Sequence, residues 1–508
     1  MLSITYSAGL TGLDGFVVTV ECSGQRNLPE MNIVGLADMA VREAKERIRA
    51  ASVNSGFPFP ELDLILNLAP ADRRKEGSSL DLAMLTAIFQ CAGIISPSMD
   101  LKDKCFLGEL SLSGKVCPLR GVLSMTLAAR EAGIKELYVP AENAQEAAAV
   151  PGITVYAIPT VGVLVDHLKG TEPLEPVKTA VPDFESFPSG DDFSDVKGQL
   201  KVKRALEIAA AGAHNVLLIG PPGTGKSMLA KRFPTILPPL TFKESVEITK
   251  IHSVAGELTD GTGLVTVRPF RAPHHTMSAP SLVGGGRIPM PGELALSHNG
   301  VLFLDELPEF PRPVMESLRQ PLEDGVVTIT RAAGRCTFPS RSILITAMNP
   351  CPCGNYGNSR QPCNCTAEMR RKYLSKISGP LLDRIDIHVT VPTLSFEELS
   401  VTEPGEPSAA IRERVIEARA FAARRFTDRE PIPNGALSPA ETRDTCVLDE
   451  AGRGVMKMAI EKLGLSARGY DRLLRVARTI ADLAKSEAIT AAHVAEAIQM
   501  RSLDREYW

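Results

Sequence analysis

The sequence lacks several features that would place it in a broad class of protein. No uninterrupted apolar run reaches the roughly 18 residues of a membrane-spanning helix, so we expect no membrane segment. The first residues, MLSITYSAGLTGLDG, hold no basic stretch followed by an apolar core, so we expect no secretory signal. There is also no internal repeat and no low-complexity tract. These absences together favour a globular protein of the cytoplasm.

An excess of positive charge is missing as well. The chain has 56 lysine and arginine residues against 60 aspartate and glutamate residues, a net charge of −4. Any binding to nucleic acid must therefore use local basic surfaces, because there is no overall positive field. Apolar residues make up 44% of the chain and charged residues 23%, which is ordinary for a globular protein. The 508 residues are enough for about two to four domains of roughly 150 residues each.

The pattern of apolar residues divides the chain into three blocks and a linker. Residues 1–170 mix strand-like and helix-like runs, and residues 171–190 are polar and proline-rich, as in a linker. Residues 191–395 alternate between strand and helix, which predicts an α/β layer fold, and residues 396–508 are mainly helical. Strands are expected at 16–22, 62–68, 216–219, 301–304 and 343–348. Helices are expected at 40–51, 80–90, 228–232, 409–425, 449–463, 467–485 and 491–499.

A phosphate-binding signature lies in the third of these segments. The apolar run Val216–Ile219 is followed at once by GPPGTGKS, residues 220–227, and then by the helix-like Met228–Arg232. This is the pattern G-x-x-x-x-G-K-[ST] in the strand–loop–helix context that it requires. Its glycines let backbone N–H groups turn inward around phosphates, and the helix N-terminus adds positive potential. In this context a chance glycine loop is the weaker interpretation.

This signature predicts a site for ATP and Mg²⁺. Lys226 is expected to reach the β- and γ-phosphates, and Ser227 to bind Mg²⁺. A second apolar run, Val301–Leu304, ends in Asp305, which can hold Mg²⁺ through water, and Glu306, which can polarise the attacking water. An Asp-Glu pair is usually only a solvated strand end, but downstream of a P-loop it indicates catalysis. The residues predicted to contact ATP or Mg²⁺ are Gly220, Pro221, Pro222, Gly223, Thr224, Gly225, Lys226, Ser227 and Asp305.

With these motifs, residues 191–395 resemble the core of an AAA+ ATPase, a P-loop α/β fold that carries a helical lid. In that family an asparagine at the end of a neighbouring strand senses the γ-phosphate. The run ILITAMN, residues 343–349, matches that strand, which implies that Asn349 is the sensor. The resemblance thus extends the catalytic set beyond the two motifs.

The family also uses arginines to stabilise the charge that develops during phosphoryl transfer. LLDRID, residues 381–386, resembles the segment that carries an arginine finger, which implies that Arg384 reaches the neighbouring subunit's site. SARG, residues 466–469, resembles the start of a lid helix, which implies that Arg468 is a second sensor, with Arg472 as the fallback. The alternative for each arginine is a surface ion pair worth about 0–1 kcal/mol. A finger supplied by a neighbour implies an oligomer, and the family implies a hexameric ring.

Two inserts resemble those of the magnesium-chelatase and replicative-helicase branch of the AAA+ proteins. One spans residues 267–287, and the other, residues 324–338, reads as a β-hairpin with a glycine turn. GELALSHNGVLFLDE, residues 292–306, matches the same branch closely. In the helicases such hairpins line a pore, where cations would follow a phosphate backbone without reading sequence. Solvated loops with interface salt bridges are the alternative. The cations assigned to DNA are Arg268, Arg271, His274, His275, Arg287, Arg331 and Arg335.

The first block resembles the proteolytic domain of Lon, an α+β fold of the ribosomal S5 domain 2-like type. The resemblance rests on NLAPADRRKEGSSLD, residues 67–81, and GKVCPLRGVLS, residues 114–124. Lon uses a Ser–Lys dyad, in which a desolvated lysine is the base for the serine. Here Ser79 takes the serine position, but the lysine position falls on Leu123, which cannot accept a proton. Two lysines, Lys75 and Lys115, lie near in sequence but off that position. We therefore predict a Lon-like domain without protease activity.

Four of the ten cysteines lie in NPCPCGNYGNSRQPCNC, residues 349–365. Cytoplasmic thiols stay reduced, so a cluster of this density is more often a metal site than a pair of disulfides. The four thiolates could bind one tetrahedral Zn²⁺, although the one-residue spacer is shorter than the usual spacer of about two to four. Free thiols or a redox switch are the alternatives. The predicted zinc ligands are Cys351, Cys353, Cys363 and Cys365. Zinc would fix the shape of the loop and so help assembly or the engagement of a DNA strand.

The whole chain resembles the YifB/ComM family of magnesium chelatase-like AAA+ ATPases. The shared order is a Lon-like domain at 1–170, the linker at 171–190, the AAA+ core at 191–395 and the helical lid domain at 396–508. The resemblance implies a ring-forming helicase or branch-migration motor on single-stranded or branched DNA, because the group's competence member promotes branch migration during natural transformation. The alternatives are an ATPase subunit that helps to insert Mg²⁺ into a porphyrin, an ATP-dependent protease, and a remodeller of protein partners.

Overall fold

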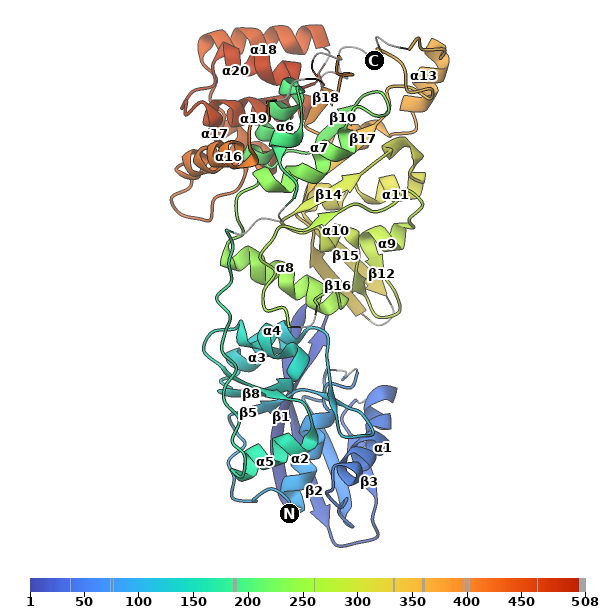
Figure 1. Ribbon diagram of the computed structural model, residues 1–508, viewed down its shortest axis with the longest axis vertical. Helices are drawn as coiled ribbons and strands as arrows, with labels where there is room; N and C mark the ends of the chain where they lie inside the picture. Colours follow the sequence, from blue (N-terminus) through green and yellow to red (C-terminus); the bar gives the residue numbers. More distant parts are fainter. Residues whose placement is uncertain are drawn as a thin grey trace. The chain divides into compact units, whose positions relative to one another are not determined.

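The computed structural model describes residues 1–501 apart from 37, 74, 76, 186–189, 260, 332–333, 359–360, 396–397, 399, 401–402 and 464. Parts of the predicted linker and of the predicted helical block therefore lie outside the described residues. The chain folds into two compact units, whose elements are labelled in Figure 1. No helix among the described residues combines the length and the apolar content needed to cross a bilayer. Unit 1 comprises Met1–Asp183, Phe242–Thr266 and Gly334–Phe338, and unit 2 comprises Phe184–Thr241, Val267–Ala333 and Pro339–Trp508.

Unit 1 is built on a seven-stranded mixed sheet with the strand order β3-β4-β2-β1-β5-β8-β9. Apolar residues alternate along β2, which buries Val18, Val20 and Cys22 on one face. A short pair, β6 (Glu109–Leu110) and β7 (Val116–Cys117), lies outside this sheet. The strands of the large sheet are β1 (Leu2–Thr11), β2 (Asp14–Gln25), β3 (Met31–Val34), β4 (Asp63–Ala69), β5 (Lys104–Phe106), β8 (Glu136–Pro140) and β9 (Thr154–Ile158).

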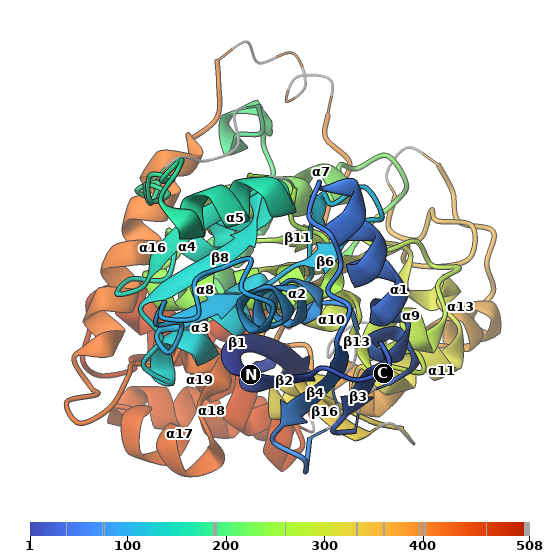
Figure 2. The same cartoon turned by 90° about the horizontal axis from the view of Figure 1, so that it is seen from below.

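Two large hydrophobic cores hold most of the buried apolar residues on the helices of unit 1. Helices α1, α2 and α5 share one core with the sheet, and α3 and α4 share the other. Helices α2 and α3 pack against β1 and β2 (Figure 2). Helix α8 also belongs to this unit, and the backbone N–H of Gly121 donates to the Ser253 hydroxyl of α8 at 2.8 Å. The helices are α1 (Met39–Asn54), α2 (Asp81–Cys91), α3 (Val122–Glu131), η1 (Ala141–Asn143), α4 (Ala144–Ala148), α5 (Val161–Lys169) and α8 (Phe242–Ala255).

Unit 2 contains a five-stranded sheet with the strand order β11-β14-β17-β10-β18, and all of its pairings are parallel. The central strands are buried along their whole length, which explains why they read as continuous apolar runs. These strands are β10 (Val216–Ile219), β11 (Phe270–Arg271), β14 (Val301–Leu304), β17 (Ile343–Met348) and β18 (Ile387–Thr390). The short strands of unit 2 are β12 (Gly284–Gly285), β13 (Met290–Pro291) and β15 (Val326–Arg331). Strand β16 (Gly334–Pro339) belongs almost entirely to unit 1.

Helices surround this sheet, and the last five form a group beside α6 (Figure 1). Helix α19 begins at a cap in which the Ser466 hydroxyl accepts the backbone N–H of Gly469 at 3.1 Å. The α-helices are α6 (Leu200–Gly212), α7 (Lys226–Arg232), α9 (Ala279–Val283), α10 (Glu293–Leu296), α11 (Arg312–Ser317), α12 (Pro321–Asp324), α13 (Ala367–Leu374), α14 (Gly379–Leu382), α16 (Ser408–Ala423), α17 (Pro439–Thr445), α18 (Glu450–Leu463), α19 (Ala467–Leu483) and α20 (Ala491–Gln499). The 3₁₀ helices are η2 (Phe193–Asp195), η3 (Phe233–Ile236), η4 (Leu307–Glu309) and η5 (Asn434–Ala436).

The predicted elements are confirmed, with boundaries that differ by a few residues. The strand expected before the phosphate-binding signature is β10, and the strand expected before the two carboxylates is β14. The four helices expected at the C-terminal end are α16, α18, α19 and α20. The α/β prediction for the middle of the chain is confirmed by the parallel sheet of unit 2. The two arms of the predicted hairpin are strands β15 and β16.

Candidate nucleotide site and thiol cluster

Three neighbouring strands of unit 2 end beside one another and bring the predicted nucleotide residues together. Strand β17 lies between β10 and β14, and all three run parallel. Their carboxyl ends therefore meet at one edge of the sheet, which is where ligands bind in open α/β folds. The P-loop follows β10, Asp305 and Glu306 follow β14, and Asn349 follows β17. Segments far apart in the sequence thus form one candidate site.

The P-loop between β10 and α7 takes a shape that requires its glycines. Gly223 and Gly225 have φ angles of 76° and 86°, in the left-handed region that favours glycine. At Gly220, an added Cβ would lie 2.3 Å from the carbonyl oxygen of Val391. The loop therefore passes too close to the backbone after β18 to accept a side chain there. This conformation ends directly at the N-terminus of α7, where Lys226 begins the helix.

The Lys226 ammonium lies between the P-loop backbone and the predicted sensor. Its Nζ donates to the carbonyl oxygens of Gly220 and Pro221 at 2.7 and 2.9 Å, and to Oδ1 of Asn349 at 3.3 Å. Burial lowers the pKa of Lys226, while the carboxylates of Asp305 and Glu306 act in the opposite direction. The structure therefore places the two residues that were predicted to contact the γ-phosphate side by side.

The predicted Mg²⁺ residues are also in direct contact. The Ser227 hydroxyl donates to Oδ2 of Asp305 at 2.6 Å, and Oδ1 of Asp305 accepts the backbone N–H of Glu306 at 2.9 Å. A hydroxyl and a carboxylate beside a phosphate-binding loop form the kind of hard oxygen donor set that suits Mg²⁺. The residues present thus fit the ion that the P-loop implies.

Glu306 has a neighbour that the sequence did not reveal. Its side chain is 56% exposed, and Nδ1 of His275 lies 3.7 Å from its Oε2. The His275 ring also contacts the rings of His274 and Phe310, with centroid distances of 4.1 and 6.3 Å. His275 reaches Glu306 because β11 pairs with β14, which brings the segment after β11 to the same edge of the sheet. Only a prediction of that strand pairing could have shown the contact.

The predicted arginine finger, Arg384, follows α14, and the predicted second sensor, Arg468, lies on α19. The guanidinium of Arg384 forms an ion pair with Glu323 and donates to the carbonyl of Pro380 at 2.7 Å. Arg468 is exposed in the first turn of α19. Within the described part of the chain, no hydrogen bond or ion pair joins either arginine to residues 220–227.

Arg472, the alternative candidate for the second sensor, lies at the edge of the sheet opposite the P-loop. Its Nε lies 3.9 Å from Oδ1 of Asp386, which precedes β18, whereas the P-loop follows the end of β10. Oδ2 of Asp386 lies 3.2 Å from Nδ1 of His214, which precedes β10. Burial lowers the pKa of Arg472 to about 10. This position favours a structural role for Arg472 in holding α19 to the sheet.

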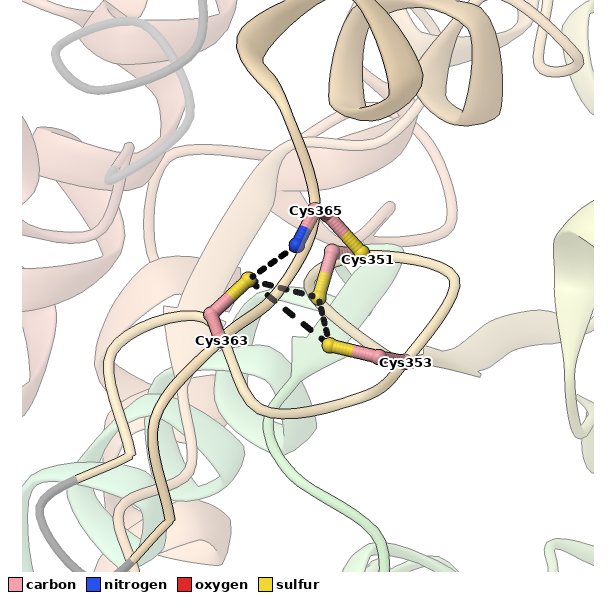
Figure 3. Close-up of side chains that lie close together, drawn as sticks. All are labelled: Cys351, Cys353, Cys363 and Cys365. Carbon is pink, nitrogen blue, oxygen red and sulfur yellow. Dashed lines mark hydrogen bonds between the residues drawn. The ribbon is translucent and has the colours of Figure 1, made fainter.

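The four predicted zinc ligands form a cluster in the loop between β17 and α13 (Figure 3). Their sulfur atoms all lie within 4.8 Å of one another. The Sγ of Cys351 is 3.4 Å from that of Cys353 and 3.7 Å from that of Cys363, and Cys353 and Cys363 are also separated by 3.7 Å. These distances are far longer than a disulfide bond of about 2.05 Å.

The spacing of the sulfur atoms fits a tetrahedral zinc site. Zn–S bonds of about 2.3 Å imply S···S edges of about 3.8 Å, close to the observed separations. The backbone N–H of Tyr356 donates to Sγ of Cys351 and that of Cys365 donates to Sγ of Cys363, both at 3.4 Å. Such outer contacts orient and stabilise thiolate ligands. The cluster is therefore compatible with a structural Zn²⁺ ion.

Six of the seven cations assigned to DNA fall into two groups, and the seventh, His275, lies beside Glu306. Arg268 donates to backbone carbonyls, including that of Asn299 at 2.7 Å, and Arg271 forms a two-pronged ion pair with Glu293 at 2.6 and 2.8 Å. These two guanidinium groups therefore stabilise the fold of unit 2 through contacts within it. Four others are exposed and can be reached by a ligand. These are His274, Arg287, Arg331 and Arg335.

The Lon-like pattern in unit 1 contains no Ser–Lys dyad within the described residues. Ser79 is buried, and its hydroxyl donates to the carbonyl of Ala8 at 3.1 Å. Leu123 is also buried, in the first turn of α3. The two lysines near in sequence are used elsewhere, since Lys75 donates to the carbonyl of Pro70 and Lys115 pairs with Glu142 at 3.0 Å. Among the residues that the structure describes, no base contacts the Ser79 hydroxyl.

Comparison with protein families finds matches to three segments of the chain. Residues 192–399 match the family described as magnesium chelatase, subunit ChlI. Residues 20–143 match the family described as subunit ChlI of Mg-chelatase, and residues 405–501 match its C-terminal part. The first match covers the parallel sheet, the P-loop and the thiol cluster. It supports the prediction of an AAA+ core, a type of fold that binds ATP and Mg²⁺.

Full-length relatives share the same order of segments. The chain is 41% identical to competence protein ComM of Haemophilus influenzae, over 99% of this chain and 98% of that protein. It is 40% identical to the YifB protein of Escherichia coli, over 99% of this chain and 98% of that protein. A shorter similarity, 28% identity over 193 residues, links 34% of this chain to 23% of the Lon protease of Brucella suis. This similarity agrees with the Lon-like pattern.

Proposed function

This chain belongs to the YifB/ComM family of magnesium chelatase-like ATPases, and from that premise we propose that it is a DNA motor driven by ATP hydrolysis. The motor acts as a helicase or branch-migration enzyme on single-stranded or branched DNA. The observation that carries the ATPase part is the convergence of Lys226, Ser227, Asp305, Glu306 and Asn349 at one edge of the parallel sheet. The name of the ComM relative supports a role in competence, and we propose a role in DNA recombination for this chain.

Each residue of the nucleotide site has a proposed task. The P-loop amides and Lys226 bind the β- and γ-phosphates, and Ser227 and Asp305 hold Mg²⁺. Glu306 is the general base, which polarises the attacking water, and Asn349 orients the γ-phosphate. The contact between Lys226 and Asn349 supports this arrangement, because it puts the two polar groups on the same side of the P-loop.

Arg384 and Arg468 are proposed to act on the site of a neighbouring subunit in a homo-oligomeric ring, for which six subunits are expected. Arg384 supports this proposal because it lies near the surface with a carboxylate partner, Glu323, that it can exchange for phosphate. Arg468 supports it because it is exposed at the start of a helix. Arginines supplied in this way complete a site only when the ring assembles.

The proposed DNA contacts come from exposed cations on short hairpins. Arg287 lies at the exposed tip between β12 and β13, whose register pairs Gly284 with Pro291 and Gly285 with Met290. Arg331 is exposed at the end of β15. Cations at hairpin tips can follow a phosphate backbone without reading its sequence. Together with His274 and Arg335 they are the residues on which this proposal rests.

The remaining parts have supporting tasks in this proposal. Residues 1–170 form a Lon-like domain without protease activity, residues 171–190 a linker, residues 191–395 the AAA+ core and residues 396–508 the helical lid. Zn²⁺ in the thiol cluster fixes the loop between Asn349 and α13. The free thiols fit a reducing compartment, and the cytoplasm is the location that we propose. A magnesium chelatase-type subunit or a remodeller of proteins is the alternative function.

Unwinding of a four-way DNA junction tests this function. Purified protein is mixed with a labelled junction, ATP and Mg²⁺, and the separated arms are resolved on a gel. The proposal predicts ATP-dependent separation that Lys226→Ala abolishes. Intact junctions under conditions in which the protein hydrolyses ATP would leave the motor proposal without support and favour the chelatase-type or remodelling alternative.

A further inference from the structure

The thiol cluster lies in a loop that contacts the P-loop of the same chain. Gly354 follows the first cysteine pair and has a φ angle of 80°. A Cβ added to Gly354 would lie 2.7 Å from Cδ and 3.2 Å from Cγ of Pro222. The backbone of the thiol loop therefore packs directly on the proline ring of the P-loop. Only glycine allows an approach this close.

The first cysteine pair is connected to the nucleotide site by covalent and polar contacts. Cys351 follows the sensor Asn349 after a single proline, and the Asn349 amide accepts a hydrogen bond from Lys226. The backbone N–H of Gly354 donates to the carbonyl of Cys351 at 2.9 Å, which closes the turn that carries Gly354. Any shift of this cysteine pair is therefore transmitted to both the sensor and the P-loop.

The second cysteine pair is connected to α13. The guanidinium of Arg370, on α13, donates to the carbonyl of Cys365 at 2.8 Å and stacks 4.3 Å from the centre of the Tyr356 ring. At the other end of α13, the buried Tyr373 hydroxyl accepts the backbone N–H of Asn349. The contact between Tyr373 and Asn349 therefore connects the two ends of the segment 349–373, and the thiol cluster connects the two cysteine pairs between them.

We propose that this loop supports the P-loop, with Gly354 as a positioning residue and the metal held by the four cysteines as the group that fixes the support. This proposal rests on the proposed nucleotide and zinc sites. It gives the metal an effect on nucleotide binding within one chain, and this effect requires neither ring assembly nor DNA. Loss of the metal frees one cysteine pair from the other. The backbone of Gly354 then no longer packs on Pro222, and the P-loop amides are no longer kept in the positions that bind phosphate.

Gly354→Ala and Gly357→Ala make a matched test of this contact. Both glycines lie in the same loop with similar φ angles, 80° and 76°, so alanine strains the backbone equally at either position. An added Cβ at Gly357 has no heavy atom within 4 Å, whereas at Gly354 it meets Pro222. Both variants keep all four cysteines. The difference between them isolates the contact with the P-loop.

Three quantities are measured for each protein. They are its affinity for a fluorescent ATP analogue, its zinc content by elemental analysis, and the hydrogen exchange of residues 220–227 in the absence of nucleotide. Gly354→Ala is expected to weaken binding at least about fivefold relative to Gly357→Ala and to raise exchange in the P-loop, with zinc content unchanged. Adding Pro222→Ala to Gly354→Ala should recover part of the affinity, because the smaller ring-free side chain relieves the collision. Equal affinities for the two glycine variants overturn the proposal.

The role of the metal is tested with Cys363→Ser/Cys365→Ser, which leaves the pair next to the P-loop intact. This variant should lose its zinc, weaken analogue binding in the same direction and raise hydrogen exchange at residues 220–227. Wild-type affinity in zinc-free protein overturns the part assigned to the metal. If neither the wild type nor Gly357→Ala binds the analogue, the proposed nucleotide site itself fails. That result differs from normal binding by all variants, which removes only the present inference.

Discussion

The Ser227 hydroxyl donates a hydrogen bond to Asp305 across 2.6 Å, although the two residues follow different strands of the sheet. β17 separates these two strands, so the contact depends on the packing of the P-loop over the sheet edge. The pair forms the oxygen donor set that we assign to Mg²⁺.

Removing the base should separate binding from turnover. Glu306→Gln should bind ATP with nearly unchanged affinity but lower kcat by about 100-fold or more, because the amide cannot accept the proton of the attacking water. Steady-state ATPase and equilibrium binding of a nucleotide analogue measure the two effects. Glu316→Gln changes a carboxylate on α11 that pairs with Arg319 and should leave both quantities unchanged. A normal kcat in Glu306→Gln would show that another residue is the base.

Arg384→Ala should lower kcat by about 1,000-fold while the chain still binds nucleotide, because an arginine finger acts on transition-state charge. A mixing experiment tests whether it acts on a neighbour. Arg384→Ala and Lys226→Ala should each be inactive alone. Mixed rings should regain activity at interfaces that pair an intact P-loop with an intact finger. Failure of the mixture to regain activity, with mixed rings demonstrated, would exclude action on the neighbouring site.

His275→Ala should reduce the coupling between DNA and ATP hydrolysis. The imidazole lies 3.7 Å from the Glu306 carboxylate and follows a segment rich in cations, so it can report the presence of DNA to the base. We expect the ratio of the DNA-stimulated rate to the basal rate to fall about two- to fivefold, which corresponds to the loss of one weak polar contact of about 0.4–1 kcal/mol. His274→Ala, at the exposed neighbouring position, should keep this ratio once DNA is saturating. An unchanged ratio in His275→Ala would leave the histidine without this role.

Elemental analysis should find about one zinc ion per chain, as expected for a four-cysteine site. Cys363→Ser/Cys365→Ser should remove it and lower the thermal unfolding temperature, because the ion joins two turns of one loop. Cys117→Ser, in unit 1 and outside the cluster, should keep the zinc. Folded wild-type protein without zinc would contradict the metal assignment. Normal rings and normal unwinding by metal-free protein would remove its role in assembly and strand engagement.

Purified protein should not degrade casein in the presence of ATP, because the buried Ser79 hydroxyl donates to a backbone carbonyl and contacts no base in the described part of the chain. The measurement is release of labelled casein fragments over time, with Ser79→Ala as the comparison. ATP-dependent degradation that Ser79→Ala abolishes would show that unit 1 is an active protease.

Local sequence was sufficient to predict the P-loop and the two carboxylates. A strand, a glycine loop and a helix follow one another within residues 216–232, and the buried run before Asp305 is continuous because its strand is covered on both faces. The cysteine cluster was also predictable, since its four thiols come from two short turns of one loop. Each of these features depends on residues that are close in the chain.

Contacts between segments that are distant in the chain could not be predicted from local sequence. The proximity of His275 to Glu306 depends on the pairing of β11 with β14, and the packing of Gly354 on Pro222 depends on how two loops meet above the sheet. Arg271 appeared as a free cation in the sequence, but Glu293 neutralises it in the structure. Charge patterns alone do not show which cations already have an internal partner.

We propose that nucleotide hydrolysis at the edge of the parallel sheet is coupled to DNA. The most direct measurement is the steady-state ATPase rate of the purified protein at low salt, with and without single-stranded or forked DNA. We predict a higher ATPase rate with DNA. The stimulation should weaken as the salt concentration rises, because the proposed contacts are made to DNA phosphates. An unchanged rate, together with no binding of DNA at low salt, would contradict this proposal.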